Sequence, residues 1–126
     1  IPNAIIMTPS NGEELQLLLN TGYDFKGPAF VRYPRDSTTA VKAVDIKQQV
    51  KIGESKKIRH GKKVALLVFG TLLNQALIAA EATDITLVDM RFVIPLDESM
   101  LQTVCEQHDV TGRVTDRRYR YRCYRL

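Results

Sequence analysis

The stretch Ala29-Phe30-Val31-Arg32-Tyr33-Pro34-Arg35 decides how the first third of the sequence folds. Its first three residues are apolar and β-prone, and Pro34 removes a backbone donor and fixes its own φ, so we predict a strand that ends there. The following loop starts with Arg35, at the mouth of a sheet. Ligands of parallel α/β folds bind at the carboxyl ends of strands, and a guanidinium offers a planar fork of donors to carboxylate or phosphate. Arg35 is therefore a candidate anion-binding residue, and a solvated loop arginine is the alternative.

A strand and a helix are predicted immediately upstream of this stretch. Asn3 to Met7 is apolar, and Ser10 with Glu13 has the spacing of a capping box. We predict a helix from Asn11 to Thr21, with Gly22 at its left-handed C-terminal position. The predicted buried face carries leucines at spacings of three and four, namely Leu15, Leu18 and Leu19. Strand, helix and strand together have the length of one right-handed βαβ crossover.

Downstream, residues 37–62 are polar and rich in lysine, and we interpret them as an interdomain linker that adds short strands at most. His60 lies there among cations, without a nearby acid, which favours a solvated loop histidine over a catalytic one.

A second α/β pattern begins at Lys63. The continuous apolar run Val64–Phe69 predicts a strand buried on both faces, and Gly70-Thr71 turns it into a helix with Thr71 as cap. A phosphate at this helix start is the alternative to capping alone. The next predicted elements are a strand over Ile85–Met90, a helix opened by Asp97 and Glu98, and a strand that begins at Val110.

These patterns predict an incomplete α/β protein with partial open, mostly parallel sheets. Residues 1–36 form the last βαβ unit of one domain, residues 37–62 the linker, residues 63–110 the first half of a second domain, and residues 111–126 a tail. The helix after Asp97 is expected to bury Met100, Leu101, Val104 and Cys105. Asp89 and Arg91, which frame Met90, suggest an ion pair or a subunit contact.

The composition excludes several classes of protein. With 126 residues and 44% hydrophobic residues the chain is long enough to bury a core, and no apolar run approaches the roughly 20 residues of a membrane helix. We expect a cytoplasmic protein without a membrane partner. Cys105 and Cys123 lack zinc-site or disulfide-framework spacing, so we expect free thiols.

The net charge of +4 is concentrated in the tail. Residues 111–126 carry six arginines and one acid, a net +5, whereas residues 1–110 carry −1. Such a tail binds polyanions weakly and with strong salt dependence, so we expect no nucleic-acid partner. Its alternating Arg and Tyr also fit a β-strand or an RNA-binding arm.

Several words of the sequence resemble the 1-deoxy-D-xylulose 5-phosphate synthase family in order and spacing. They are Ile1–Ser10, Val31–Arg35, Phe69-Gly70-Thr71, Leu87–Val93 and Pro95-Leu96-Asp97. The resemblance implies a transketolase-like fold, spanning the end of the pyrimidine-binding domain and the start of the carboxy-terminal domain. After about Val110 the family pattern of glutamates and glycines is lost, and we hypothesise a frameshift.

The resemblance also implies the chemistry of the intact enzyme. This family condenses pyruvate with glyceraldehyde 3-phosphate, using thiamine diphosphate and Mg²⁺, and serves isoprenoid, thiamine and pyridoxol biosynthesis. Arg35 falls on the family's substrate-phosphate arginine, while Asp36 and Ile94 replace a glycine and a lysine. The family's catalytic, cofactor-binding and metal-binding residues would precede Ile1, so we expect none here and no cofactor bound to this chain.

We therefore expect an inactive chain from a homo-oligomeric transferase. One alternative is a non-catalytic fragment that acts by association through exposed sheet edges. Another is a relative such as transketolase or the β-subunit of a 2-oxo acid dehydrogenase, which the Arg-Tyr-Pro-Arg loop fits less well.

Overall fold

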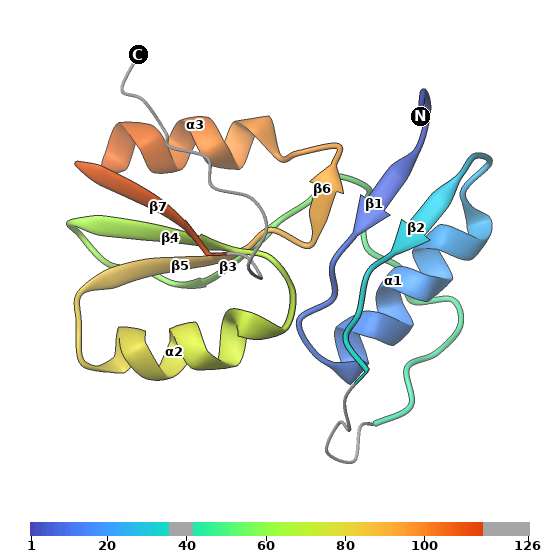
Figure 1. The fold of residues 1–126 in the computed structure, drawn as a ribbon, viewed down its shortest axis with the longest axis horizontal. Coiled ribbons are helices and arrows are strands. Elements are labelled where there is room, and N and C mark those ends of the chain that lie inside the picture. Colours follow the sequence, from blue (N-terminus) through green and yellow to red (C-terminus); the bar gives the residue numbers. More distant parts are fainter. Residues whose placement is uncertain (36–41, 115–126) are drawn as a thin grey trace.

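A computed structural model describes residues 1–35 and 42–114, which form two halves, each with its own sheet (Figure 1). The first sheet has strand order β2-β1-β6 and the second β3-β5-β4-β7. In chain order the elements are β1 (Ile5–Met7), α1 (Gly12–Asp24), β2 (Ala29–Val31), β3 (Lys56–Arg59), β4 (Val64–Val68), the 3₁₀ turn η1 (Gly70–Leu72), α2 (Leu73–Glu81), β5 (Ile85–Asp89), β6 (Phe92–Ile94), α3 (Glu98–Gln107) and β7 (Val110–Val114).

The first half contains the predicted βαβ unit. β1 and β2 are parallel, with Ile5 opposite Ala29 and Met7 opposite Val31. Helix α1 covers one face of this sheet, where Ile5 and Met7 pack against the fully buried Leu18. The strand that ends before Pro34 is thus confirmed.

The ends and the buried face of α1 differ from the prediction. Asn11, not Ser10, is the cap, because its side-chain oxygen accepts a hydrogen bond from the Glu14 N–H at 2.9 Å. The helix continues through Gly22 to Asp24, and a Cβ at Gly22 would lie 2.9 Å from Met7 Cε, so this glycine serves close packing instead of termination. Leu19 is exposed, since the face toward the sheet carries Glu14, Leu18 and Thr21 instead.

Residues 42–50, within the predicted linker, run along α1 and are tied to it by polar side chains. Gln16 Oε1 accepts from the Val44 N–H at 3.0 Å, and the Asn20 side-chain amide donates to the Asp45 and Gln48 carbonyls, each at 3.1 Å. Thr21 Oγ1 accepts from the Val50 N–H at 2.9 Å, and Val50 joins the core of the first half. This part of the segment therefore belongs structurally to the first half.

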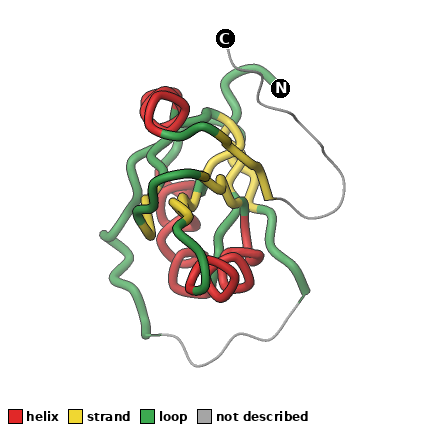
Figure 2. The backbone as a smooth tube through the Cα atoms, turned by 90° about the vertical axis from the view of Figure 1, so that its left-hand side faces the viewer, coloured by secondary structure: helices red, strands yellow, loops and turns green. Residues whose placement is uncertain are grey.

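The second half is an open α/β sheet with a helix on each face (Figures 1 and 2). β4 pairs in parallel with β5 and β7, while β3 is an antiparallel edge strand on β5. Ala65 and Leu67 of β4 pack with Val104 of α3, whereas Val68 packs with Ala76 of α2. Parallel strands need such cover on both faces, which explains the continuous apolar run in β4.

Four details of the second half correct or confirm the predictions. Thr71 is not a cap, because η1 intervenes and α2 starts without a side-chain cap. Asp97 is confirmed as the cap of α3, since its Oδ1 accepts from the Met100 N–H at 3.0 Å. Cys105, expected on the buried face of α3, is exposed. The strand predicted at Val110 exists and extends to Val114.

The crossing of β6 from the second half into the first sheet was not predicted. After β5 the chain turns at Arg91, and β6 pairs antiparallel with β1, with Phe92 opposite Met7. Phe92 is fully buried in the core of the first half. The two halves are therefore joined by a strand as well as by the connecting segment.

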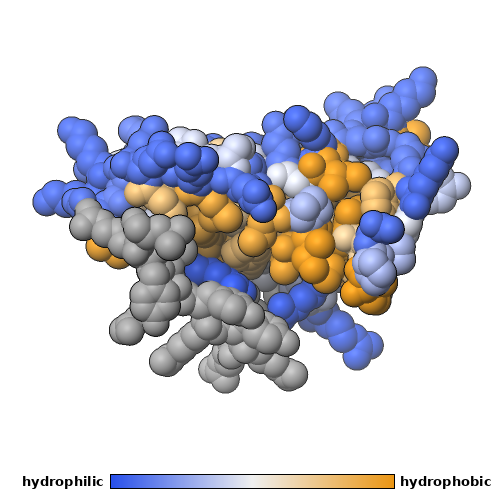
Figure 3. Space-filling view, turned by 90° about the horizontal axis from the view of Figure 1, so that it is seen from above, coloured by the Kyte–Doolittle hydropathy of each residue, from blue (hydrophilic) through white to orange (hydrophobic). Residues whose placement is uncertain are grey.

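The sheet face opposite α1 carries an apolar row. Ile6 is the register partner of both Phe30 and Ile94, and Phe30 and Ile94 are 44% and 46% exposed. In the view from above, apolar surface extends across the junction of the two halves (Figure 3). Across the two open sheets, three of the five strand pairings are parallel, which confirms the predicted α/β class with partial open, mostly parallel sheets.

Candidate functional site

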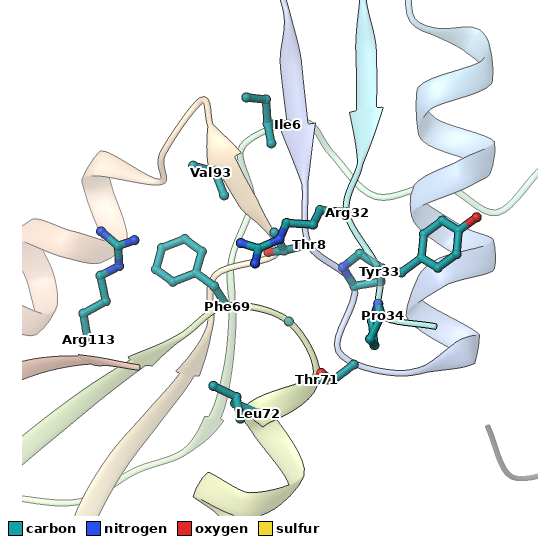
Figure 4. Close-up of a pocket in the computed structure, with 12 residues that line it drawn as sticks. Ile6, Thr8, Arg32, Tyr33, Pro34, Phe69, Thr71, Leu72, Val93 and Arg113 are labelled. Atoms are coloured by element: carbon teal, nitrogen blue, oxygen red, sulfur yellow. The ribbon is translucent and has the colours of Figure 1, made fainter. Parts of the chain in front are cut away.

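A cavity of about 410 Å³ lies at the junction of the two halves (Figure 4). The first sheet contributes lining residues on β1 and β6 and in the segments that follow β1 and β2. The second sheet contributes residues that follow β4 and one residue on β7. The lining residues are Ile6, Thr8, Pro9, Arg32, Tyr33, Pro34, Phe69, Gly70, Thr71, Leu72, Val93 and Arg113. The carboxyl ends of parallel strands β1, β2 and β4 thus meet at one cavity, which is the expected ligand position in open α/β sheets.

Backbone pairing places Arg32 in this cavity. The Arg32 N–H donates to the Met7 carbonyl at 2.9 Å and so extends the parallel pairing by one residue beyond β2. Pro34 follows and lines the cavity together with Tyr33. In Figure 4 the Arg32 side chain extends from the end of β2 toward Phe69 of the other half.

The opposite wall is formed where β4 ends. Gly70 has φ +78°, which favours glycine, and the chain then enters η1 and α2. The Phe69 N–H donates to the Val114 carbonyl at 3.1 Å, which continues the pairing of β4 with β7. The Arg113 guanidinium lies over the Phe69 ring, with its central carbon 5.1 Å from the ring centroid. This geometry is that of a cation–π contact.

A buried ion pair fixes the turn between the two sheets beside this cavity. Arg91 Nε and Nη2 donate to the two carboxylate oxygens of Glu14 at 2.9 and 2.6 Å, and the side chains are 12% and 9% exposed. Arg91 has φ +56°, an uncommon conformation for a residue with a side chain. Its carbonyl accepts from the N–H of Thr8, a cavity residue, at 2.7 Å. The ion pair suggested for Arg91 therefore exists, but its partner is Glu14 and not Asp89.

Asp89 lies behind this turn, 1% exposed. Burial raises the pKa of its carboxyl group, and the nearby Glu14 charge acts in the same direction. The Ser10 hydroxyl and the Arg91 N–H, which donates to Asp89 Oδ1 at 3.2 Å, oppose the rise in pKa. The Ser10 Oγ atom is buried and makes no hydrogen bond of normal geometry to the described residues. The Ser10 hydroxyl therefore favours the charged form of the Asp89 carboxyl group only because it lies nearby.

The predicted anion-binding residue, Arg35, is exposed and does not line the cavity, whereas Arg32 of the same loop does. Arg35 directly precedes residues 36–41, so Asp36 lies outside the described residues. The role of Arg35 stays a prediction. The residues that sequence reasoning missed are Arg32, Phe69 and Arg113. Of these three residues, only Arg32 could have been found from the sequence, because it directly follows the predicted apolar strand.

The remaining candidates are structural or exposed. His60 is exposed, as expected of a loop histidine, and Cys123 lies outside the described residues. His108 is buried, with Nδ1 2.9 Å from the Val104 carbonyl and Nε2 2.7 Å from Thr86 Oγ1. These contacts tie the end of α3 to β5 and give His108 a packing role.

The described residues do not form a site for the diphosphate cofactor and metal that the resemblance implies. Within residues 1–35 and 42–114, no three His, Cys, Asp or Glu side chains are grouped to hold a metal ion. None of the described residues that line the cavity carries a carboxylate that could activate an aminopyrimidine, and the guanidinium groups of Arg32 and Arg113 suit an anion. None of the helices in the described part is long and apolar enough to cross a membrane.

Comparisons with known proteins agree with this architecture. Residues 53–121 match the family described as transketolase, C-terminal domain. The chain is 50% identical over 109 residues to the 1-deoxy-D-xylulose-5-phosphate synthase of Aeromonas hydrophila, and 46% identical over 110 residues to that of Francisella philomiragia. These matches cover 86% and 87% of the chain but only 18% of each synthase.

A solved structure shows the same fold. It is described as a split gene transketolase, inactive beta4 tetramer, and superimposes with a TM-score of 0.73 at 20% identity, covering 90% of this chain and 40% of that one. The family match begins at Gly53 and extends past Val114, so it includes β3 to β7. The chain belongs to the transketolase C-terminal domain family, and the sequences it matches over most of its length are 1-deoxy-D-xylulose-5-phosphate synthases.

Proposed function

We propose that this chain is part of a thiamine-diphosphate-dependent transferase that condenses pyruvate with glyceraldehyde 3-phosphate to 1-deoxy-D-xylulose 5-phosphate and carbon dioxide. The observation that carries the proposal is the cationic cavity at the carboxyl ends of β1, β2 and β4, in a chain with synthases among its relatives. Thiamine diphosphate supplies the carbanion chemistry of such enzymes. The part proposed for the described residues is to bind substrate.

The role proposed for the loop after β2 is to hold the substrate phosphate. Arg35 is the residue assigned by resemblance, and Arg32 is the one that the geometry places in the cavity. A guanidinium donates two parallel hydrogen bonds to phosphate, which fixes orientation as well as charge. The two arginines are three residues apart, on either side of Pro34, and both follow β2.

The test uses an intact enzyme, namely the Aeromonas hydrophila synthase in which residues 1–114 of this chain replace the matching segment. We expect Arg32→Ala and Arg35→Ala each to raise the KM for glyceraldehyde 3-phosphate by about 10- to 100-fold and to leave the KM for pyruvate unchanged. Lys47→Ala removes an exposed cation from the segment beside α1 and is the matched control. Equal effects on both substrates would show that the loop supports the fold and does not bind phosphate.

Further parts of the proposal concern the intact protein. It uses Mg²⁺ with the cofactor, works in the cytoplasm as a homo-oligomer, and feeds isoprenoid, thiamine and pyridoxol biosynthesis. The 126-residue chain alone is inactive. Calorimetry with thiamine diphosphate and Mg²⁺ tests this last statement, because binding at micromolar affinity would contradict it.

A second candidate function, association without catalysis, is favoured by the apolar row of Phe30, Ile6 and Ile94 beside the edge strand β2. An exposed strand edge is a pairing template, and an uncovered sheet face is a docking surface. Light scattering at high protein concentration tests it. Oligomers that Phe30→Lys disrupts would support association, and a monomer at all concentrations would exclude it.

A further inference from the structure

The cavity receives a positive charge from each half of the molecule. Arg32 follows β2 of the first sheet, and Arg113 lies on β7 of the second. No aspartate or glutamate is among the described residues that line the cavity. Both guanidinium groups also interact with other groups of the chain, so a ligand would add to or exchange those contacts.

Phe69 separates the two cations. Its ring lines the cavity and carries the Arg113 guanidinium at 5.1 Å, while Arg32 extends toward it from the other side in Figure 4. Ile6, Leu72 and Val93 add apolar lining. At about 410 Å³ the cavity is near the lower end of the roughly 300–1,000 Å³ range of ligand pockets. It therefore suits a small molecule with a short carbon chain and charged ends.

Arg113 was not assigned any role by the sequence or by the resemblance. It is the third residue of the segment 111–126, where the sequence departs from the family pattern. Its position is nevertheless fixed, because β7 pairs with β4 along its whole length and Arg113 stands opposite Leu67. The second cation is therefore a feature of this chain's own strand.

We propose that the cavity binds a small metabolite with two anionic groups, a phosphate held by Arg32 and a carboxylate held by Arg113, with Phe69 against the carbons between them. The inference rests on the proposed function in one respect, namely that the same cavity holds the substrate phosphate. It adds a preference for a carboxylate at the other end, which an aldehyde substrate lacks. Arg113 is then a specificity-determining residue.

The experiment is calorimetric titration of the 126-residue chain at low ionic strength with two probes, 3-phosphoglycerate and glyceraldehyde 3-phosphate. Both carry phosphate on three carbons, and only the first carries a carboxylate. We expect 3-phosphoglycerate to bind about tenfold more tightly, because a charge-assisted pair is added. Arg113→Gln should abolish this preference, Arg113→Lys should keep part of it, and Arg32→Gln should weaken both probes.

Lys57→Gln, which removes an exposed cation from β3, controls for net charge and should leave the preference intact. Circular dichroism verifies the fold of each variant, and Phe69→Leu, which keeps both arginines, should reduce affinity for both probes. Equal affinity of the two probes, a preference that survives Arg113→Gln, or no binding of either probe at millimolar concentration would overturn the inference. The hybrid synthase is not used, so a hybrid without activity together with an Arg113-dependent preference would refute the proposed function alone.

Discussion

Glu14→Ala is the perturbation that tests most sharply how the two halves are joined. Glu14 is in the first turn of α1, and both of its carboxylate oxygens accept hydrogen bonds from Arg91, the residue at which the chain passes from β5 to β6. Removing the carboxylate leaves the Arg91 guanidinium buried without the group that accepts two of its hydrogen bonds. It also releases a residue held at φ +56°. The variant therefore removes the ion pair that holds this turn.

The expected loss follows from the burial of the pair. Removing one partner of a buried ion pair costs about 3–5 kcal/mol. Because the two side chains retain 12% and 9% exposure, we expect the lower end, about 3 kcal/mol. For a chain of this length that loss lowers the Tm by about 10 °C. Glu13→Ala, in the same helical turn but exposed, loses only a helix-dipole interaction of about 0.3–1 kcal/mol.

The assay is urea unfolding of the 126-residue chain followed by circular dichroism, with Glu13→Ala as the matched control. A double variant, Glu14→Leu with Arg91→Met, removes both charges and should recover most of the loss, since apolar replacements of buried pairs are often neutral. If Glu14→Ala costs no more than Glu13→Ala, the ion pair does not hold the turn and the reasoning is refuted.

Three further predictions concern titration and close packing. Burial alone would raise the pKa of Asp97, but hydrogen bonds from the Ser55 and Met100 N–H groups and from the Ser55 and Ser99 hydroxyls lower it to about 2. The folded pKa of Asp97 is below its unfolded value of about 3.9, so the charged carboxylate stabilises the fold above pH 4, and this stabilisation is lost as the pH falls toward 2. Because solvent screens the partly exposed group, we expect a contribution of roughly 1 kcal/mol. Asp97→Asn should therefore flatten the dependence of Tm on pH between pH 4 and pH 2. Because the pKa of Asp89 is raised in the folded protein, ionisation of this carboxyl group destabilises the fold as the pH rises above about 4. Asp89→Asn should therefore raise the Tm at pH 7 and change it little at pH 3. A lower Tm of the variant at pH 7 would contradict this prediction. A Cβ at Gly61 would lie 2.5 Å from the Ile85 backbone carbon, so we expect Gly61→Ala to cost about 3 kcal/mol in urea unfolding. Gly112→Ala should cost less, because the nearest atom to its Cβ is a flexible methyl of Leu66 at 3.1 Å.

Local patterns in the sequence predicted the elements well where packing and propensity agree. The strand before Pro34, the buried run of β4 and the helix opened by Asp97 all have one-dimensional signals, namely a breaker, an apolar run and a cap. Errors occurred where neighbouring residues compete for one role. Asn11 capped α1 in place of Ser10, and Gly22 was needed for packing on Met7 and not for termination.

The cavity could be predicted only in part, because its walls come from segments far apart in the chain. A strand that ends at Pro34 predicts a ligand site at that edge, but not that Arg32 would line the cavity while Arg35 would not. The crossing of β6 into the first sheet depends on Phe92 filling a core made by Ile5 and Leu18, a tertiary effect without a local signal. A role for Arg113 could not be predicted, because it lies in the segment where the sequence departs from the family pattern.

The frameshift hypothesis and the domain boundaries stay predictions, like the role of Arg35. Residues 115–126 lie outside the described part, so the frameshift hypothesis still depends on translating the gene in its other frames, and recovery of a glycine-rich continuation would support it. The predicted domain boundaries at residues 36, 62 and 110 also stay predictions.

The most direct test of the account is the activity of the hybrid synthase, measured as 1-deoxy-D-xylulose 5-phosphate formed from pyruvate and glyceraldehyde 3-phosphate. Residues 1–114 of this chain replace the matching segment of the Aeromonas hydrophila enzyme, and the parent enzyme is the reference. We predict a kcat/KM within about tenfold of the parent, because the chain is 50% identical to the parent enzyme over 109 matched residues. A folded hybrid of normal oligomeric state that forms no product would contradict the claim that this chain belongs to a synthase.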